Sequence, residues 1–390
     1  MPSALNQRTM EKSAKQSFDS GISYLEIGGS DLAIAAFSEA IRLAPNYAQA
    51  YFNRGVAYGD KGQLDQAIAD YTEAIRLNPY DVGAYNNRAF DFGHKGDYDK
   101  AIADYSAAIR LNPQCADAYY GRAIARGRNG DLERAVADYT EAIRLNPKWA
   151  AAYNNRGFDH GQMGQLGKAI ADYTAAIRLN PDYADAYYNR AIAYGRKGEY
   201  GKAIADCTEA IRLEPKWADA YNNRGFDYGQ MGKFRKAVAD YSKAIRLNPQ
   251  YAKAYYNRGI AFADKGRLDK AIADYTEAIR LNPKYTDAYY NRGLAYAGKG
   301  EFDKAIADYT AVIRLNPNDA EAYGSRGLAY GTKGDYDKAI ADYSEAIRLN
   351  PNDAQAYYNR SVAYRKTTEN AKAETDFEEA RKLGFKAARV

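Results

Sequence analysis

Side chains suited to acid–base or nucleophilic chemistry are scarce in this sequence. It holds two histidines, His94 and His160, and two cysteines, Cys115 and Cys207, and these four do not follow a metal-ligand spacing. A nucleophile is inert without a base in hydrogen-bond reach, and neither histidine stands at a fixed offset from a serine or cysteine. We therefore predict a protein that is not an enzyme and that uses no cofactor and no metal ion.

Asparagine, in contrast, recurs at a regular spacing. Eight asparagines stand at one constant interval or at a multiple of it: Asn53, Asn87, Asn155, Asn189, Asn223, Asn257, Asn291 and Asn359. An amide offers donors and an acceptor together, so a ladder of amides can hold the backbone of an extended peptide. The alternative is that these asparagines cap or bridge neighbouring helices. We favour the peptide-binding interpretation.

The interval that separates these asparagines also separates the prolines along the chain. All prolines but Pro2 lie on this lattice, from Pro45 and Pro79 to Pro351, and such a period indicates a repeat architecture. We divide the chain into a tail over residues 1–13, one solenoid over residues 14–387 and a short tail over 388–390. The repeats are 14–47, 48–81, 82–115, 116–149, 150–183, 184–217, 218–251, 252–285, 286–319, 320–353 and 354–387.

Each repeat reads as two amphipathic helices. In repeat 48–81 the first stripe is Tyr51, Gly55 and Tyr58, and the second is Ala67, Tyr71, Ala74 and Ile75. Both stripes have helical spacing. Gly62 stands between them, where the chain must turn through a conformation that a β-carbon would strain. The prediction is an all-α protein.

The pattern Tyr51, Gly55, Tyr58, Ala67, Tyr71, Ala74 and Pro79 resembles the tetratricopeptide repeat signature and recurs over residues 14–387. The resemblance implies an α-solenoid, a right-handed superhelix of antiparallel helix pairs whose first helices line a concave groove. Such proteins generally act as adaptors or assembly platforms. Members related to the O-linked glycosyltransferases carry an asparagine ladder similar to this one. Repeat 354–387 turns polar and looks like a C-terminal cap.

Aromatic and aliphatic residues accompany the asparagines on the predicted inner face. We number the places of each repeat from its first residue, so Asn53 stands at place six of repeat 48–81. Place five carries Phe52, Tyr120, Tyr188, Tyr256 and Tyr290, and place nine carries Val56, Ile124, Ile192, Ile260 and Leu294. An exposed apolar strip of this length indicates a partner or self-association. Alternatively, the rings pack on the adjacent first helix.

A second period, twice as long as the first, overlies it. This double period places Asp91, Asp159 and Asp227 in every second repeat. Duplication of a two-repeat block explains it without any function. The sharper hypothesis is a ligand that itself repeats and meets the aspartate row with hydrogen-bond donors or a cation.

Arginine at place seven recurs in ten consecutive repeats, and we place it in the packing stripe. Arg54 is matched by Asp70 on the second helix, and Arg88 by Asp104. A buried arginine needs a carboxylate, because an unpaired buried charge costs several kcal/mol. We interpret these pairs as structural ion pairs between helices rather than as a track for anions.

The composition narrows the range of partners. Lys+Arg 55 against Asp+Glu 50 leaves a net charge of +5 with no basic run, so nucleic acid is not the expected partner. The longest apolar runs are about six residues, such as 32–37, too short for a membrane span, and residues 1–13 carry no secretory signal. We expect a cytoplasmic scaffold that binds a protein or peptide. Alternatives are a self-assembling homo-oligomer and, last, single-stranded RNA binding.

Overall fold

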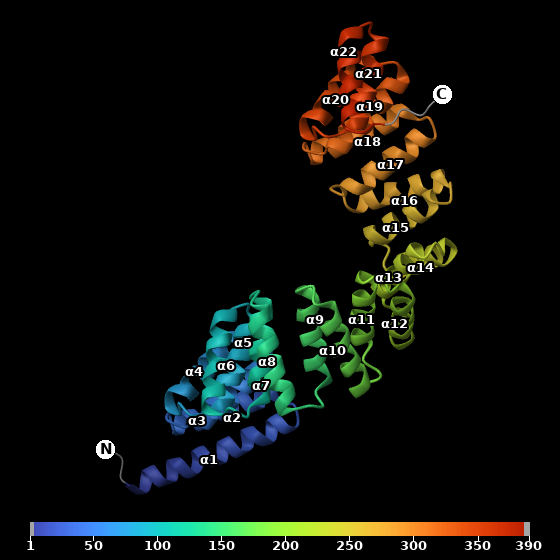
Figure 1. Cartoon of the computed structure of the whole chain (residues 1–390). Coiled ribbons are helices and arrows are strands. Elements are labelled where there is room, and N and C mark those ends of the chain that lie inside the picture. The colour runs from blue at the N-terminus through green and yellow to red at the C-terminus, as the bar shows by residue number, and fades with distance from the viewer. Residues whose placement is uncertain (1–3, 386–390) are drawn as a thin grey trace. The chain divides into compact units, whose positions relative to one another are not determined.

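The computed structural model describes residues 4–385, with side chains from Met10 onward, and this part of the chain contains 22 helices and no strand. The helices form two compact units, Met1–Lys197 and Gly198–Val390 (Figure 1). Each unit is a succession of packed helix pairs. The predicted all-α solenoid fold is thus confirmed.

The first unit contains α1 (Ala4–Glu26), α2 (Ser30–Leu43), α3 (Ala48–Asp60), α4 (Leu64–Leu77), α5 (Val82–His94), α6 (Tyr98–Leu111), α7 (Ala116–Arg128), α8 (Leu132–Leu145), α9 (Ala150–Gln162), α10 (Leu166–Leu179) and α11 (Ala184–Arg196). The second contains α12 (Tyr200–Leu213), α13 (Ala218–Gln230), α14 (Phe234–Leu247), α15 (Ala252–Ala263), α16 (Leu268–Leu281), α17 (Thr286–Gly298), α18 (Phe302–Leu315), α19 (Ala320–Lys333), α20 (Tyr336–Leu349), α21 (Ala354–Lys366) and α22 (Asn370–Lys382).

The ends of the chain differ from the regular repeat. The helix α1 begins at Ala4, so residues 4–13 lengthen the first helix of repeat 14–47, where the sequence predicts a tail. The expected tail 388–390 lies outside the described residues. In the last repeat Thr368 stands where others have glycine and adopts a φ of 63°, close to the 70° of Gly62.

Most helix pairs are held by a ring that packs on a small residue, whereas repeat 184–217 has Cys207 at the place of the ring. Tyr71 of α4 is 3% exposed, and a β-carbon on Gly55 of α3 would lie 2.7 Å from its Cε1 atom. Ala67 and Ala74, on either side of Tyr71 along α4, are fully buried. A larger residue at Gly55 would force the ring to move, which explains why small residues recur at place eight.

Successive first helices pack directly on one another. In the first unit α3 contacts α5, α5 contacts α7, α7 contacts α9, and α9 contacts α11; in the second, α13 contacts α15 and α15 contacts α17. Second helices of successive repeats lack contacts of this extent in the described part of the chain. The first helices therefore form the more closely spaced row. We call the side of this row that faces away from the second helices the inner face of each unit.

An arginine at place seven connects three helices. Arg54 binds Asp70 of its own repeat through two hydrogen bonds of 2.7 and 2.8 Å, and its Nη1 donates to Ser38 Oγ of the preceding repeat at 3.0 Å. Equivalent ion pairs of 2.6 to 2.8 Å join Arg88 to Asp104, Arg122 to Asp138, Arg156 to Asp172, Arg224 to Asp240, Arg258 to Asp274, Arg292 to Asp308, Arg326 to Asp342 and Arg360 to Asp376.

The serine or threonine that accepts the third bond is itself fixed. Thr72 Oγ1 donates to the carbonyl of Ile68 at 2.7 Å and accepts from Arg88 Nη1 at 3.0 Å. The hydroxyl thus links the arginine to the backbone of the second helix in the preceding repeat. We call this arrangement of arginine, aspartate and hydroxyl the arginine clamp.

We predict that Arg88→Leu lowers the free energy of unfolding by about 3 to 5 kcal/mol, because it leaves Asp104 buried without its cation. Urea unfolding followed by circular dichroism measures this. The double variant Arg88→Leu/Asp104→Leu recovers most of the loss. Arg42→Leu is the control, since Arg42 and its partner Glu39 are 67% and 44% exposed and solvent screens such a pair, so its loss should change the stability little. Equal losses for Arg88→Leu and Arg42→Leu would contradict the clamp.

Candidate functional site

Large apolar side chains are exposed along the inner face at place nine. In the first unit Phe90, Phe158 and Ile192 are 58%, 50% and 37% exposed. In the second unit the exposed members are Phe226, Leu294, Leu328 and Val362. We call these residues the place-nine strip. Phe90, Phe158 and Phe226 were not among the residues predicted for this place, although the same repeat spacing identifies them.

The rings at place five are half-buried and pack between repeats. Tyr120 stacks on Trp149, with ring centroids 4.2 Å apart, and lies 5.7 Å from Tyr139. Phe52 lies 5.9 Å from Tyr71, and Tyr256 and Tyr290 make similar contacts with Tyr275 and Tyr309. Tyr188 also has interactions within the protein. Much of the surface of each ring is therefore used in packing within the protein.

Four of the eight asparagines of the ladder bridge neighbouring first helices. The amide at place six donates through Nδ2 to the side chain at place five of the preceding repeat. The pairs are Asn155 with Tyr120 at 3.0 Å, Asn189 with Asn154 at 3.2 Å, Asn257 with Asn222 at 3.0 Å, and Asn291 with Tyr256 at 2.8 Å. Asn87 lies near the phenol of Tyr71 and acts against the rise that burial causes in the pKa of this phenol.

The remaining asparagines differ. Asn53 donates to the carbonyl of Gln49 in its own helix at 2.8 Å, and Asn359 accepts from Gln355 at 2.8 Å. Asn223 is also bonded. The bridging role that the sequence left open is thus visible in the geometry, and peptide binding by the ladder stays a prediction.

One rung of the ladder has no side chain, and we call it the missing rung; place six of repeat 320–353 is Ser325, whose Oγ lies 3.0 Å from the Tyr290 hydroxyl. Place six of repeat 116–149 is Gly121, so Asn86 at place five of the preceding repeat meets no amide there. Asn86 Nδ2 donates to Cys115 Sγ at 3.3 Å, but its Oδ1 is buried and has no hydrogen-bond partner. The equivalent oxygens of Asn154 and Asn222 each accept from the next asparagine.

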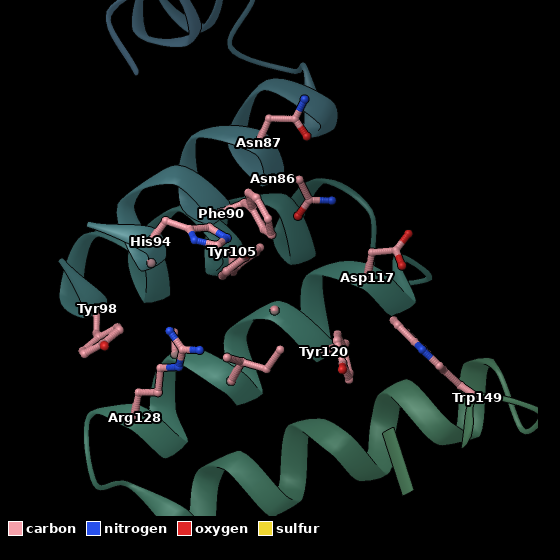
Figure 2. A pocket seen from close by; sticks show the side chains of 14 residues that line it. Asn86, Asn87, Phe90, His94, Tyr98, Tyr105, Asp117, Tyr120, Arg128 and Trp149 are labelled. Carbon is pink, nitrogen blue, oxygen red and sulfur yellow. The ribbon is translucent and has the colours of Figure 1, made fainter. Parts of the chain in front are cut away.

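A cavity of about 520 Å³ opens at the missing rung, between α5 and α7. Figure 2 shows Asn86, Asp117, Tyr120 and Trp149 toward one end and His94, Tyr98 and Arg128 toward the other. Phe90 and Tyr105 lie between these groups. The cavity is therefore largely aromatic, with polar atoms at both ends.

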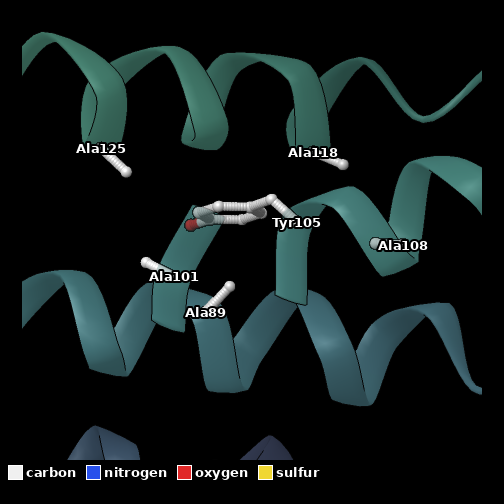
Figure 3. Close-up of a cluster of buried hydrophobic side chains, with 6 residues drawn as sticks. All are labelled: Ala89, Ala101, Tyr105, Ala108, Ala118 and Ala125. Carbon is white, nitrogen blue, oxygen red and sulfur yellow. The ribbon is translucent and has the colours of Figure 1, made fainter. Parts of the chain in front are cut away.

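Tyr105 forms the floor of this cavity because it leans toward α7. Figure 3 shows its ring between Ala89 and Ala101 on one side and Ala118 and Ala125 on the other. A β-carbon on Gly121 would lie 2.3 Å from Tyr105 Cζ, closer than any real contact. Ala89 stands where most repeats have the glycine that receives the ring. The three residues Ala89, Tyr105 and Gly121 are thus mutually dependent.

The aspartates of the double period are buried rather than exposed on the inner face. Asp91, Asp159 and Asp227 are 4%, 5% and 5% exposed, because place ten packs against the preceding repeat, as Ala57 does against Phe37. Asp91 Oδ2 and Asp159 Oδ2 have no hydrogen-bond partner. Burial raises the carboxyl pKa to about 6 in Asp91 and Asp159 and to about 7 in Asp227.

Asp91 nevertheless borders open space. It lines a cavity of about 520 Å³ with Val56, Gly59, Tyr71 and Phe90. Asp159 faces Gly127, where a β-carbon would lie 3.4 Å from Oδ2. The structure therefore brings the first two aspartates close to the inner face without exposing them.

The histidines and cysteines occupy unrelated positions. His160 is 8% exposed, its Nδ1 lies 3.0 Å from Gln165 Oε1, and burial lowers its pKa. His94 is exposed and packs edge-on against Phe90, with ring centroids 4.4 Å apart. Burial raises the pKa of the Cys207 thiol. Within residues 10–385 no three His, Cys, Asp or Glu side chains gather as a metal site.

Comparison with family models identifies these repeats. Models described as "TPR repeat" match residues 21–62, 160–198, 227–266 and 259–300, and models described as "Tetratricopeptide repeat" match 48–81, 91–150, 121–158, 184–216, 286–319, 320–353 and 343–375. The chain belongs to the tetratricopeptide repeat family. Proteins of this fold are in general non-catalytic scaffolds for protein–protein interaction.

Solved tetratricopeptide repeat structures resemble the chain. One from Parabacteroides merdae ATCC 43184 is 22% identical, has a TM-score of 0.50, and covers 64% of this chain and 98% of its own. The TPR protein YrrB is 27% identical with a TM-score of 0.41, over 47% of this chain and 95% of its own. No match was found among curated protein sequences. Among the described helices, none is long and apolar enough to cross a membrane.

We predict that Gly121→Asn destabilises this tetratricopeptide repeat protein although it restores the missing rung. The new side chain would clash with Tyr105, at a cost of about 1 to 3 kcal/mol. Gly324→Asn is the control, because a β-carbon there meets nothing within 4 Å. Thermal unfolding of both variants measures the difference. Equal melting temperatures for the two would show that Tyr105 does not depend on Gly121.

A second prediction concerns the buried aspartates. A carboxyl whose folded-state pKa is raised stabilises the fold below its unfolded pKa, and this stabilisation is lost as the pH rises through the folded value. Asp91 faces the phenols of Tyr71 and Tyr105, and Asp159 faces those of Tyr139 and Tyr173, with Arg128 and Arg196 near these last two rings. None of these groups supplies a positive charge or a donor that would stabilise the carboxylate once Asp91 or Asp159 has lost its proton.

Asp91→Asn/Asp159→Asn should therefore raise the free energy of unfolding at pH 8, by about 1 kcal/mol or more per site, and gain little at pH 4. Urea unfolding at both pH values tests this. Asp182→Asn/Asp185→Asn removes two exposed carboxylates and should be neutral at both. A double variant that is less stable than the native protein at pH 8 would contradict the assignment.

Proposed function

We propose that this protein is a non-catalytic scaffold that holds an extended segment of a partner protein against the inner face of its first helices. The place-nine strip carries this proposal. Phe90 and Phe158 remain 58% and 50% exposed although nearby tyrosines are buried, and a strip of exposed rings along one face is typical of a surface that a partner covers.

The asparagine ladder supplies the polar part of such a surface. Asn189 and Asn291 each use one N–H to bridge to the preceding repeat, which leaves a second N–H and the carbonyl oxygen of each amide. An extended peptide has unpaired N–H and C=O groups along both edges. Amides fixed by their own bridges are well suited to meet these groups, because little entropy is lost on binding.

The two kinds of contact have different consequences for affinity and specificity. Burial of the place-nine rings provides affinity with little regard to sequence, since apolar burial is non-directional. Amide contacts to the backbone are also independent of the side chains of the partner. The scaffold would therefore select for an extended backbone conformation more strongly than for particular side chains of the partner.

The test compares binding of extended peptides by native and variant proteins. Peptides selected from a displayed random library on the native protein are measured by fluorescence anisotropy. Phe90→Ser/Phe158→Ser should weaken their binding about tenfold or more, since each half-exposed ring contributes on the order of 1 kcal/mol on full burial. Ile27→Ser/Tyr80→Ser, which removes two loop side chains that are 77% and 79% exposed, should bind as the native protein does.

Other outcomes point to other functions. A library that yields no binder, together with a molecular mass that rises with concentration, would replace the proposal with a self-assembling homo-oligomer. Binding to labelled single-stranded RNA that weakens steeply with salt would replace it with nucleic-acid recognition.

A further inference from the structure

The missing rung of the ladder leaves a buried acceptor without a donor. In repeats 150–183 and 218–251 the oxygen at place five receives an Nδ2 donor from the next repeat, at 3.2 and 3.0 Å. Asn86 has the same position, but Gly121 provides no side chain. Its Oδ1 is left buried and unpaired, a state that native proteins rarely tolerate without a ligand or bound water.

The cavity beside this oxygen has walls that favour a cation. Its rings include Phe90, Tyr105, Tyr120 and Trp149, and the stacked pair of Tyr120 and Trp149, with ring centroids 4.2 Å apart, forms one side. Aromatic faces attract cations through their quadrupoles. A ligand group with an apolar stem and a positively charged, planar end would use both the apolar surface of the rings and their attraction for a cation.

The charges near the Asn86 end are negative. Asp117 lines the cavity close to Asn86 in Figure 2 and is exposed. Asp91 on α5 and Asp117 on α7 both act on the phenol of Tyr105 in the cavity floor and help burial to raise its pKa. Arg128 and His94, which also line the cavity, stand at the opposite end.

We infer that this cavity receives an arginine side chain of the bound segment, with the guanidinium donating to Asp117 and, once the Asn86 amide turns toward the cavity, to Asn86 Oδ1, and stacking on the side of the Tyr120–Trp149 pair that lines the cavity. The inference rests on the proposed function, which supplies the segment. Arginine suits the cavity better than lysine, because its planar group presents several donors in fixed directions and stacks on aromatic faces. The ligand thereby replaces the amide that Gly121 omits.

Trp149 provides a direct measurement of occupancy. The chain has two tryptophans, and Trp217→Tyr leaves Trp149 as the sole indole; tyrosine stands at this place in repeats 150–183, 218–251 and 252–285. In this background, a short extended peptide of serine, threonine and leucine with one central arginine is titrated while Trp149 emission is recorded. The same peptide with citrulline, which keeps the shape but not the charge, is titrated in parallel.

We expect a saturable change with the arginine peptide and binding of the citrulline peptide that is about tenfold weaker. Asp117→Asn should weaken the arginine peptide by about fivefold. Asp185→Asn is the matched control, since Asp185 stands at the same place two and is also exposed; it should have no effect. Gly121→Asn, which puts an amide into the cavity, should abolish the emission change.

Equal binding of the two peptides, or an unchanged affinity in Asp117→Asn, would overturn the inference. In that case continued binding of library-selected peptides, with loss in Phe90→Ser/Phe158→Ser, would leave the proposed function standing. If neither the arginine peptide nor any library peptide binds, the proposed function fails together with the inference.

Discussion

The arginine clamp is the interaction on which the rest of the structure depends. Each repeat is too small to bury its own apolar face and must be stacked on its neighbours. Arg54 and its equivalents contact the second helix of their own repeat through a carboxylate and that of the preceding repeat through a hydroxyl. Because these bonds are directional, they fix the distance and rotation between repeats. The spacing of the first helices, and hence of every group on the inner face, follows.

Much of this could be predicted from the sequence because a repeat reports each contact many times. The helix pairs, the turn glycines and the partnership of Arg54 with Asp70 are all visible in the repeat spacing. The role of Ser38 and Thr72 in the clamp was not predicted, since a hydroxyl at that place is equally consistent with a solvated helix surface. Only the three-dimensional stacking reveals that it accepts from the arginine of the next repeat.

The inner face was harder to predict, because small angular differences around a helix decide exposure. Places five and nine lie about 40° apart on a helical wheel, and so do places six and ten. In the structure, the rings at place five are half-buried, those at place nine are exposed, and Asp91 and Asp159 at place ten are buried. The donor use of Asn155 or Asn189 depends on what the preceding repeat offers at place five, a relation between neighbouring places that the repeat period conceals.

The absence of a side chain at Gly121 has a consequence for how a strand could be aligned on this surface. An array of identical repeats offers the same contacts at every step, so a bound chain could slide by one repeat and lose almost nothing. The place without a side chain removes that equivalence, because one alignment puts a ligand group into the cavity beside Asn86 and Tyr120. One glycine thereby fixes the register in which an extended chain would bind to the repeats.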